Sequence, residues 1–220
     1  MTNAKITKNS TSSEGSIKEI LTVAFPLIIA SATHTVLTFT DRMFLSWYSA
    51  DCIAASGPAS ILSYSFICFF IGTGTYLNTI IAQYSGAKKR FYITKALWQG
   101  IYFGLLSSAA IVMLIPAGNM FIAHSEHGKQ VIILEKSYFS LLMYGGGLAV
   151  MGSVFSSFFS GRGRTRPVMI ITLISTTINI LLDYILIFGK FGFPALGIVG
   201  AGIATLLSHS IALILFASLI

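Results

Sequence analysis

Two aspartates lie inside long apolar stretches of this sequence, where an ionisable side chain is unusual. Asp41 belongs to the stretch 17–48 and Asp183 to the stretch 167–188. An ionised carboxylate is costly in an apolar medium, so such residues face a protein interior or a wet cavity and are candidates for function. Both lie at a depth of roughly 10 Å from the nearer end of their stretch, at a rise of about 1.5 Å per residue. We therefore expect them to share one cavity.

Two further polar side chains extend this pair. Asn179 lies one helical turn from Asp183 and shares its face, and Thr205 lies in the following stretch, 196–220. Carboxylate, amide and hydroxyl oxygens can bind Na⁺, and two neighbouring carboxylates in a low-dielectric site can instead bind a proton. We predict that Asp41, Asn179, Asp183 and Thr205 bind a cation, as a metal site if it is Na⁺. The sequence leaves the choice of ion open.

Each of these residues also has a purely structural interpretation. A threonine commonly bonds to the backbone of its own helix, and Asp183 could bond to a neighbouring helix. An ion pair between Asp41 and Arg42 is disfavoured, because consecutive helical side chains point about 100° apart.

Three more residues are candidates for supporting roles. His34 shares the helical face of Asp41 and could join a proton path, although a packed, neutral histidine is the alternative. Asn78 is a weaker candidate for the same cavity. Pro26 removes a helix hydrogen bond, which predicts a kink that could gate access. Proline is also a routine residue in transmembrane helices.

The composition places these residues in a membrane protein. Hydrophobic residues make up 55% of the chain and charged residues only 10%, with a mean hydropathy of +0.81, which excludes an ordinary water-soluble domain. Spanning the hydrocarbon core takes about 20 apolar residues. Six apolar runs meet this length, at 17–48, 54–84, 93–117, 134–161, 167–188 and 196–220. We predict an all-α polytopic protein, with a six-helix transmembrane bundle over 17–220 behind a disordered cytoplasmic tail, 1–16.

The distribution of basic residues predicts the topology. The formal net charge is +7, but no basic stripe is interleaved with aromatic residues, so nucleic acid is not an expected partner. One side of the predicted bundle carries Lys5, Lys8, Lys18, Lys88, Lys89, Arg90, Lys95, Arg162, Arg164 and Arg166, and the other carries Lys129, Lys136 and Lys190. The positive-inside rule then places both termini in the cytoplasm of a cell whose inner (plasma) membrane holds the protein.

Several enzyme classes lack their motifs here. The sequence contains no GxxxxGK[ST] phosphate loop, no HExxH helix and no GxSxG elbow. We therefore expect no enzyme and no cofactor, and an ion gradient of Na⁺ or H⁺ would have to supply energy.

Five sequence segments together resemble the multidrug and toxic compound extrusion family, known as MATE. They are FPL at 25–27 followed by Asp41, AQYSGA at 82–87, FSGRG at 159–163, NILLDYILIFG at 179–189 and GFPALGIVGAGIAT at 192–205. They keep the order and separation that the family shows, and they cover nearly the whole chain beyond the tail.

This resemblance implies a fold and an activity. Members of the family have twelve helices in two lobes and exchange cytoplasmic drugs or metabolites for external Na⁺ or H⁺. The chain would form the N-terminal lobe, with Asp41, Asn179, Asp183 and Thr205 at the coupling site and Pro26 bending the first helix. Leu37 stands where some relatives have tyrosine, which removes a hydroxyl from the cavity.

The expected partners follow from this interpretation. They are the lipid bilayer, a small-molecule substrate such as an organic cation, and a second six-helix lobe, either in the same chain or in a dimer partner. The last run is still apolar at Ile220, which favours a fragment. Two alternatives remain: a lipid-linked oligosaccharide flippase, which would favour a cationic cavity, and a non-transporting membrane scaffold.

Overall fold

The computed structural model describes residues 17–220, and within them the secondary structure is entirely helical. The helices are α1 (Ile17–Tyr48), α2 (Ala50–Thr75), α3 (Leu77–Gly86), α4 (Arg90–Met113), α5 (Ile115–Ala123), α6 (Lys129–Ser160), α7 (Thr165–Phe188) and α8 (Ile198–Ser218). The predicted tail, with Lys5 and Lys8, lies outside the described residues.

These helices supply six segments long and apolar enough to cross a membrane. The helices α2 and α3 together make the second segment, and α4 and α5 make the third. The break between α4 and α5 comes at Leu114, just before Pro116, whose ring nitrogen cannot donate a helix hydrogen bond. The six-helix all-α fold predicted from the apolar runs is therefore confirmed.

The turns are shorter than the sequence suggested. We expected breaks at 49–53 and 118–133, but α2 begins at Ala50 and α5 continues to Ala123. At the first turn, the Ser49 hydroxyl accepts a hydrogen bond from the Asp51 backbone N–H at 3.2 Å, which caps α2 immediately after α1. Both expected breaks were too long. A helix can include polar or Gly-rich sequence where a single side chain caps its end or where it buries an apolar face.

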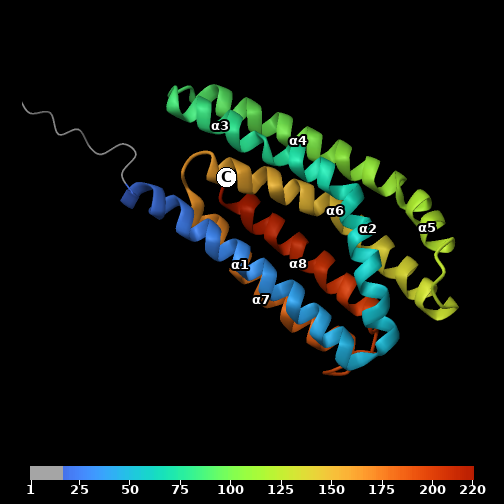
Figure 1. Ribbon diagram of the computed structural model, residues 1–220. Coiled ribbons are helices and arrows are strands. Elements are labelled where there is room, and N and C mark those ends of the chain that lie inside the picture. The colour runs from blue at the N-terminus through green and yellow to red at the C-terminus, as the bar shows by residue number, and fades with distance from the viewer. Residues whose placement is uncertain (1–16) are drawn as a thin grey trace, which may run out of the picture.

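Helix α6 is the centre of the bundle. It packs against α2, α4 and α8, whereas α7 packs against α1 and α8 (Figure 1). Small residues let α6 approach its neighbours closely: a methyl group on Gly147 would lie 2.3 Å from the Ser108 Oγ of α4, and one on Gly146 would lie 2.7 Å from Ile67 of α2. Such contacts are typical of helices that associate within membranes.

The two ends of the bundle differ in charge. The α3–α4 and α6–α7 turns lie at the same end as the beginning of α1 and the labelled C-terminus (Figure 1). These turns contain Lys88, Lys89, Arg162 and Arg164. The basic segments that were distant in sequence are thus gathered at one end.

Candidate functional site

Asp41 and Asp183 come together between α1 and α7. Their carboxyl groups are within hydrogen-bonding contact of one another. Asp183 is completely buried, and Asp41 is partly buried. An ionised carboxylate only accepts hydrogen bonds, so two carboxyl groups in this contact need a shared proton, or a cation between them.

Each aspartate has one oxygen available for such an ion. The Oδ1 atoms of Asp41 and Asp183 are buried and have no hydrogen-bond partner among the described residues. Leaving a buried acceptor unsatisfied costs about 1–3 kcal/mol, and more when the acceptor is charged. A bound proton or small cation would remove this cost.

Asn179 fixes the position of Asp183. The Asn179 Nδ2 donates to Asp183 Oδ2 at 2.7 Å, and the amide oxygen lies 3.1 Å from Ser208 Oγ and 3.2 Å from the Thr205 backbone nitrogen. This orientation of the amide follows from its neighbours, since the reverse would place two oxygens face to face. Asn179 therefore links Asp183 on α7 to α8.

A second contact strengthens the link between these helices. The Ser175 hydroxyl donates to the Ser208 carbonyl oxygen at 2.9 Å. Ser208 was missed by the sequence reasoning, although it follows Thr205 by one helical turn and so shares its face. Its role became visible only when α8 was placed against α7.

Thr205 reaches the site differently from the prediction. Its hydroxyl donates to the Ala201 carbonyl oxygen at 3.0 Å within its own helix. Only its backbone nitrogen contacts Asn179. The Thr205 side chain still lies on the wall of the neighbouring cavity.

Asp41 opens onto a cavity of about 370 Å³ between α1, α2, α6 and α8. Its polar wall is formed by His34, Thr38, Asp41, Arg42, Ser56, Ser60, Ser63, Tyr64, Tyr138, Thr205 and His209. Tyr138 of α6 and Ser60 of α2 lie together on this wall, and the half-buried His209 has a buried Nδ1 without a partner among the described residues. Tyr138 and His209 were not selected from the sequence, because their depth alone does not reveal which helices face each other.

Two of the supporting candidates lie elsewhere. Asn78 is exposed on α3, its side-chain oxygen faces Gly161, and it is not among the residues that line this cavity. Helix α3 lies at the basic end of the bundle (Figure 1). Pro26 is buried beside Arg166 and Met169 of α7, within an uninterrupted α1. His34 lies on the cavity wall with Asp41.

The sequence of this chain is similar to a family of known membrane transporters. A sequence model of the MatE family matches residues 26–185. The chain is 35% identical over 204 residues to a probable multidrug resistance protein NorM of Oceanobacillus iheyensis, covering 91% of this chain and 45% of that protein. It is 31% identical over 206 residues to the multidrug resistance protein MdtK of Klebsiella pneumoniae strain 342, covering 92% and 44%. The chain thus spans less than half the length of these relatives.

Solved structures share the fold. The chain matches the outward-facing conformation of a multidrug resistance MATE family transporter with a TM-score of 0.81 at 23% identity, covering 91% of this chain and 44% of that one. It matches the inward-facing conformation of a MATE family transporter with a TM-score of 0.76 at 22% identity, covering 91% and 45%. One six-helix fold therefore resembles about half of each structure in both conformations.

Proposed function

The chain belongs to the MATE family, and from this premise we propose that it forms one lobe of a cation-coupled antiporter that exports small organic cations. The contact between Asp41 and Asp183 beside an open cavity carries this proposal. The coupling ion is Na⁺ or H⁺, bound by the carboxyl pair. The protein works in the cytoplasmic membrane, with the basic end of the bundle in the cytoplasm.

The carboxyl pair has a chemistry suited to either ion. A proton would be shared between the two carboxyl groups, whereas Na⁺ would take the two Oδ1 atoms as ligands. Asn179 serves in both cases by holding Asp183 through the 2.7 Å hydrogen bond. The Thr205 hydroxyl would have to leave the Ala201 carbonyl to become a ligand, so it is a weaker member of the proposed set.

Ion binding would move α1 relative to α7. When both carboxyl groups are ionised and unpaired, they repel each other across a low-dielectric site. A bound cation removes this repulsion and draws α1 toward α7, while Asn179 and Ser175 hold α7 to α8. Pro26 gives α1 a position without a backbone hydrogen bond, where the helix can bend.

The cavity suits an organic cation. Asp41 supplies negative charge, and the Tyr64 and Tyr138 rings on the same wall supply faces for cation–π contact. Neutralising Asp41 with the coupling ion weakens the attraction for the organic cation, so the two ligands compete. Such competition is the basis of exchange. Alternating access needs two bodies that rock about a central site, so we expect a second lobe in the working transporter.

A transport assay tests the proposal. The protein expressed from its complete gene is reconstituted into proteoliposomes, and the movement of a fluorescent organic cation is followed under imposed Na⁺ or H⁺ gradients. Wild type, Asp41→Asn and Asp183→Asn are compared with Asp51→Asn, which makes the same change at an exposed residue in the first turn of α2.

We expect one of the two gradients to drive transport by wild type and by Asp51→Asn. We expect Asp41→Asn and Asp183→Asn each to lose this transport. Wild-type rates in both Asp41→Asn and Asp183→Asn would show that the pair is structural. If wild type moves no organic cation under any gradient, a lipid-linked oligosaccharide flippase or a scaffold becomes the better interpretation.

A further inference from the structure

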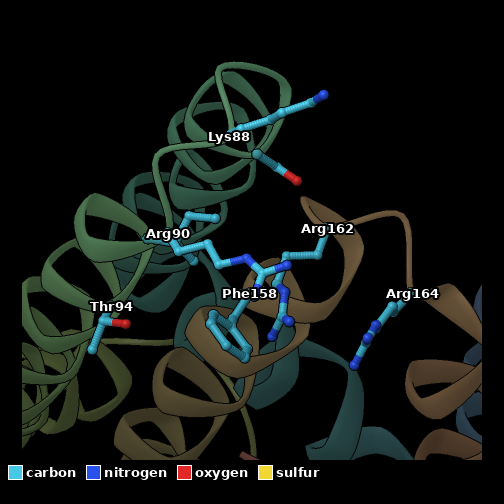
Figure 2. A pocket seen from close by; sticks show the side chains of 8 residues that line it. Lys88, Arg90, Thr94, Phe158, Arg162 and Arg164 are labelled. Carbon is cyan, nitrogen blue, oxygen red and sulfur yellow. The ribbon is translucent and has the colours of Figure 1, made fainter.

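A second pocket, separate from the carboxyl pair, lies at the basic end of the bundle. It has a volume of about 800 Å³ and lies between the α3–α4 turn and the α6–α7 turn. Its lining includes four basic residues, Lys88, Arg90, Arg162 and Arg164, together with Phe158 (Figure 2). Residues from two distant parts of the sequence thus converge on one concave surface.

Two of the basic side chains in this pocket, those of Arg90 and Arg162, lie close together. Figure 2 shows Arg90 extending from α4 toward Arg162, whose guanidinium lies beside Phe158. The Arg162 guanidinium carbon is 4.9 Å from the centre of the Phe158 ring. Partial burial and the nearby charges of Arg164 and Arg90 lower the pKa of Arg162. Like charges held this close repel one another, so an anion placed among them would be bound favourably.

No acidic side chain compensates these charges among the described residues. Among the side chains that the structure describes, at 17 and 20–220, the ion pair joins His127 and Glu135, at the opposite end of the bundle. Asp41 and Asp183 contact each other in the interior. The pocket therefore presents its positive charge to whatever enters it.

Two helix N-termini add to the positive potential. Helix α4 begins at Arg90 and α7 begins at Thr165, and both are 24 residues long. The residues at their N-cap positions, Lys89 and Arg164, form no side-chain hydrogen bond to the helix. The start of α4 also lines the pocket through Ile93 and Thr94. Free N–H groups and the helix dipole at such termini favour an anion.

The positive-inside rule accounts for basic residues at this end but not for their convergence. Lys95 and Arg166 satisfy the same rule without lining the pocket. The Lys95 amine lies 4.6 Å from the centre of the Phe91 ring, and Arg166 lies beside Pro26 in a different hollow. Lys88, Arg90, Arg162 and Arg164, by contrast, all line one pocket.

We propose that this pocket binds a phosphate group, with Arg90 and Arg162 as its main ligands. A planar guanidinium donates paired hydrogen bonds to phosphate oxygens, and basic pockets at this level of membrane proteins suit anionic lipid headgroups. Phe91 and Tyr92, which follow the pocket-lining Arg90 at the start of α4, carry exposed aromatic rings. The headgroup of an anionic phospholipid and free inorganic phosphate share this chemistry, and the experiment separates them.

The test measures binding to the protein expressed from its complete gene and purified in detergent. Thermal unfolding is recorded with phosphatidylglycerol, with phosphatidylcholine and with inorganic phosphate. The variant Arg90→Gln/Arg162→Gln is compared with Lys95→Gln/Arg166→Gln, which removes the same charge from the same end of the bundle. Because the readout is binding, it is independent of the transport activity proposed above.

We expect phosphatidylglycerol to raise the midpoint temperature of unfolding of wild type and of the control variant more than phosphatidylcholine does. We expect the apparent affinity for phosphatidylglycerol to fall at least tenfold in Arg90→Gln/Arg162→Gln. Competition by millimolar inorganic phosphate would identify free phosphate as a ligand too, and its absence would assign the pocket to lipid alone. Equal effects of the two lipids on wild type would overturn the proposal, as would equal losses in the two double variants.

Discussion

The close contact between α6 and α4 makes a sharp prediction about Gly147. A methyl group at this position would lie 2.3 Å from the Ser108 Oγ, 2.6 Å from the Ser108 Cβ and 3.0 Å from the Ser108 Cα. The last of these atoms belongs to the backbone, so a side-chain rotation cannot relieve the clash. Overpacking of this kind costs about 1–3 kcal/mol. We expect Gly147→Ala to destabilise the bundle by about this amount.

The same helix provides the matched control. A methyl group on Gly152 would meet no atom within 4 Å, and alanine is a better helix former than glycine by up to about 1 kcal/mol. Gly152→Ala should therefore leave stability unchanged or raise it. In a chain of this size, a change of 1 kcal/mol moves the melting temperature by roughly 2–4 °C, which thermal unfolding in detergent can resolve.

A rescue variant separates the proposed clash from a general intolerance of Gly147. Ser108→Gly removes the Oγ and Cβ atoms that the new methyl group would strike, so Gly147→Ala/Ser108→Gly should recover much of the lost melting temperature. Equal melting temperatures for Gly147→Ala and Gly152→Ala would refute the argument from close packing.

Three further predictions concern the Ser49 cap of α2, the carboxyl pair with Asn179, and the proposed bend of α1 at Pro26. Ser49→Ala should lower stability by about 1 kcal/mol because it removes the cap of α2, as measured by thermal unfolding beside Ser46→Ala, whose hydroxyl bonds within α1; equal effects would contradict it. Asn179→Ala should cost about 1.5–3 kcal/mol because Asp183 loses its 2.7 Å donor, and it should also impair transport; an unchanged melting temperature would contradict the assigned bond. Pro26→Ala should keep or raise stability while slowing transport, since α1 gains a backbone hydrogen bond at the point where we propose that it bends. Unchanged transport would remove Pro26 from the mechanism.

Most of the fold could be predicted from the sequence, because membrane spans are decided by length and hydropathy. Each apolar run corresponds to one segment long and apolar enough to cross a membrane. The two aspartates within these runs could be selected from the sequence because burying a charge is costly. The ends of the helices were harder to predict from the sequence. Ser49 acts through one local hydrogen bond, and the helix break at Leu114 depends on Pro116 within a run that is apolar on both sides.

The site was only partly predictable for a different reason. Depth in the membrane follows from position along a helix, so Asp41 and Asp183 could be paired by depth alone. Which helices face each other does not follow from depth. For this reason Ser208, Tyr138 and His209 were not selected, and the place of Asn78 outside this cavity was not foreseen. The pocket around Arg90 and Arg162 was hidden in the same way, because a charge count cannot distinguish a basic surface from a basic cavity.

The most direct test of the central claim is the release of the coupling ion on addition of substrate. Purified protein is equilibrated with ²²Na⁺ or lightly buffered at fixed pH, an organic cation is added, and released Na⁺ or H⁺ is measured for wild type, Asp41→Asn, Asp183→Asn and Asp51→Asn. If the carboxyl pair is the coupling site, wild type and Asp51→Asn release one of the two ions, and both variants of the pair release none. Release at the wild-type level from Asp41→Asn and Asp183→Asn would contradict the account.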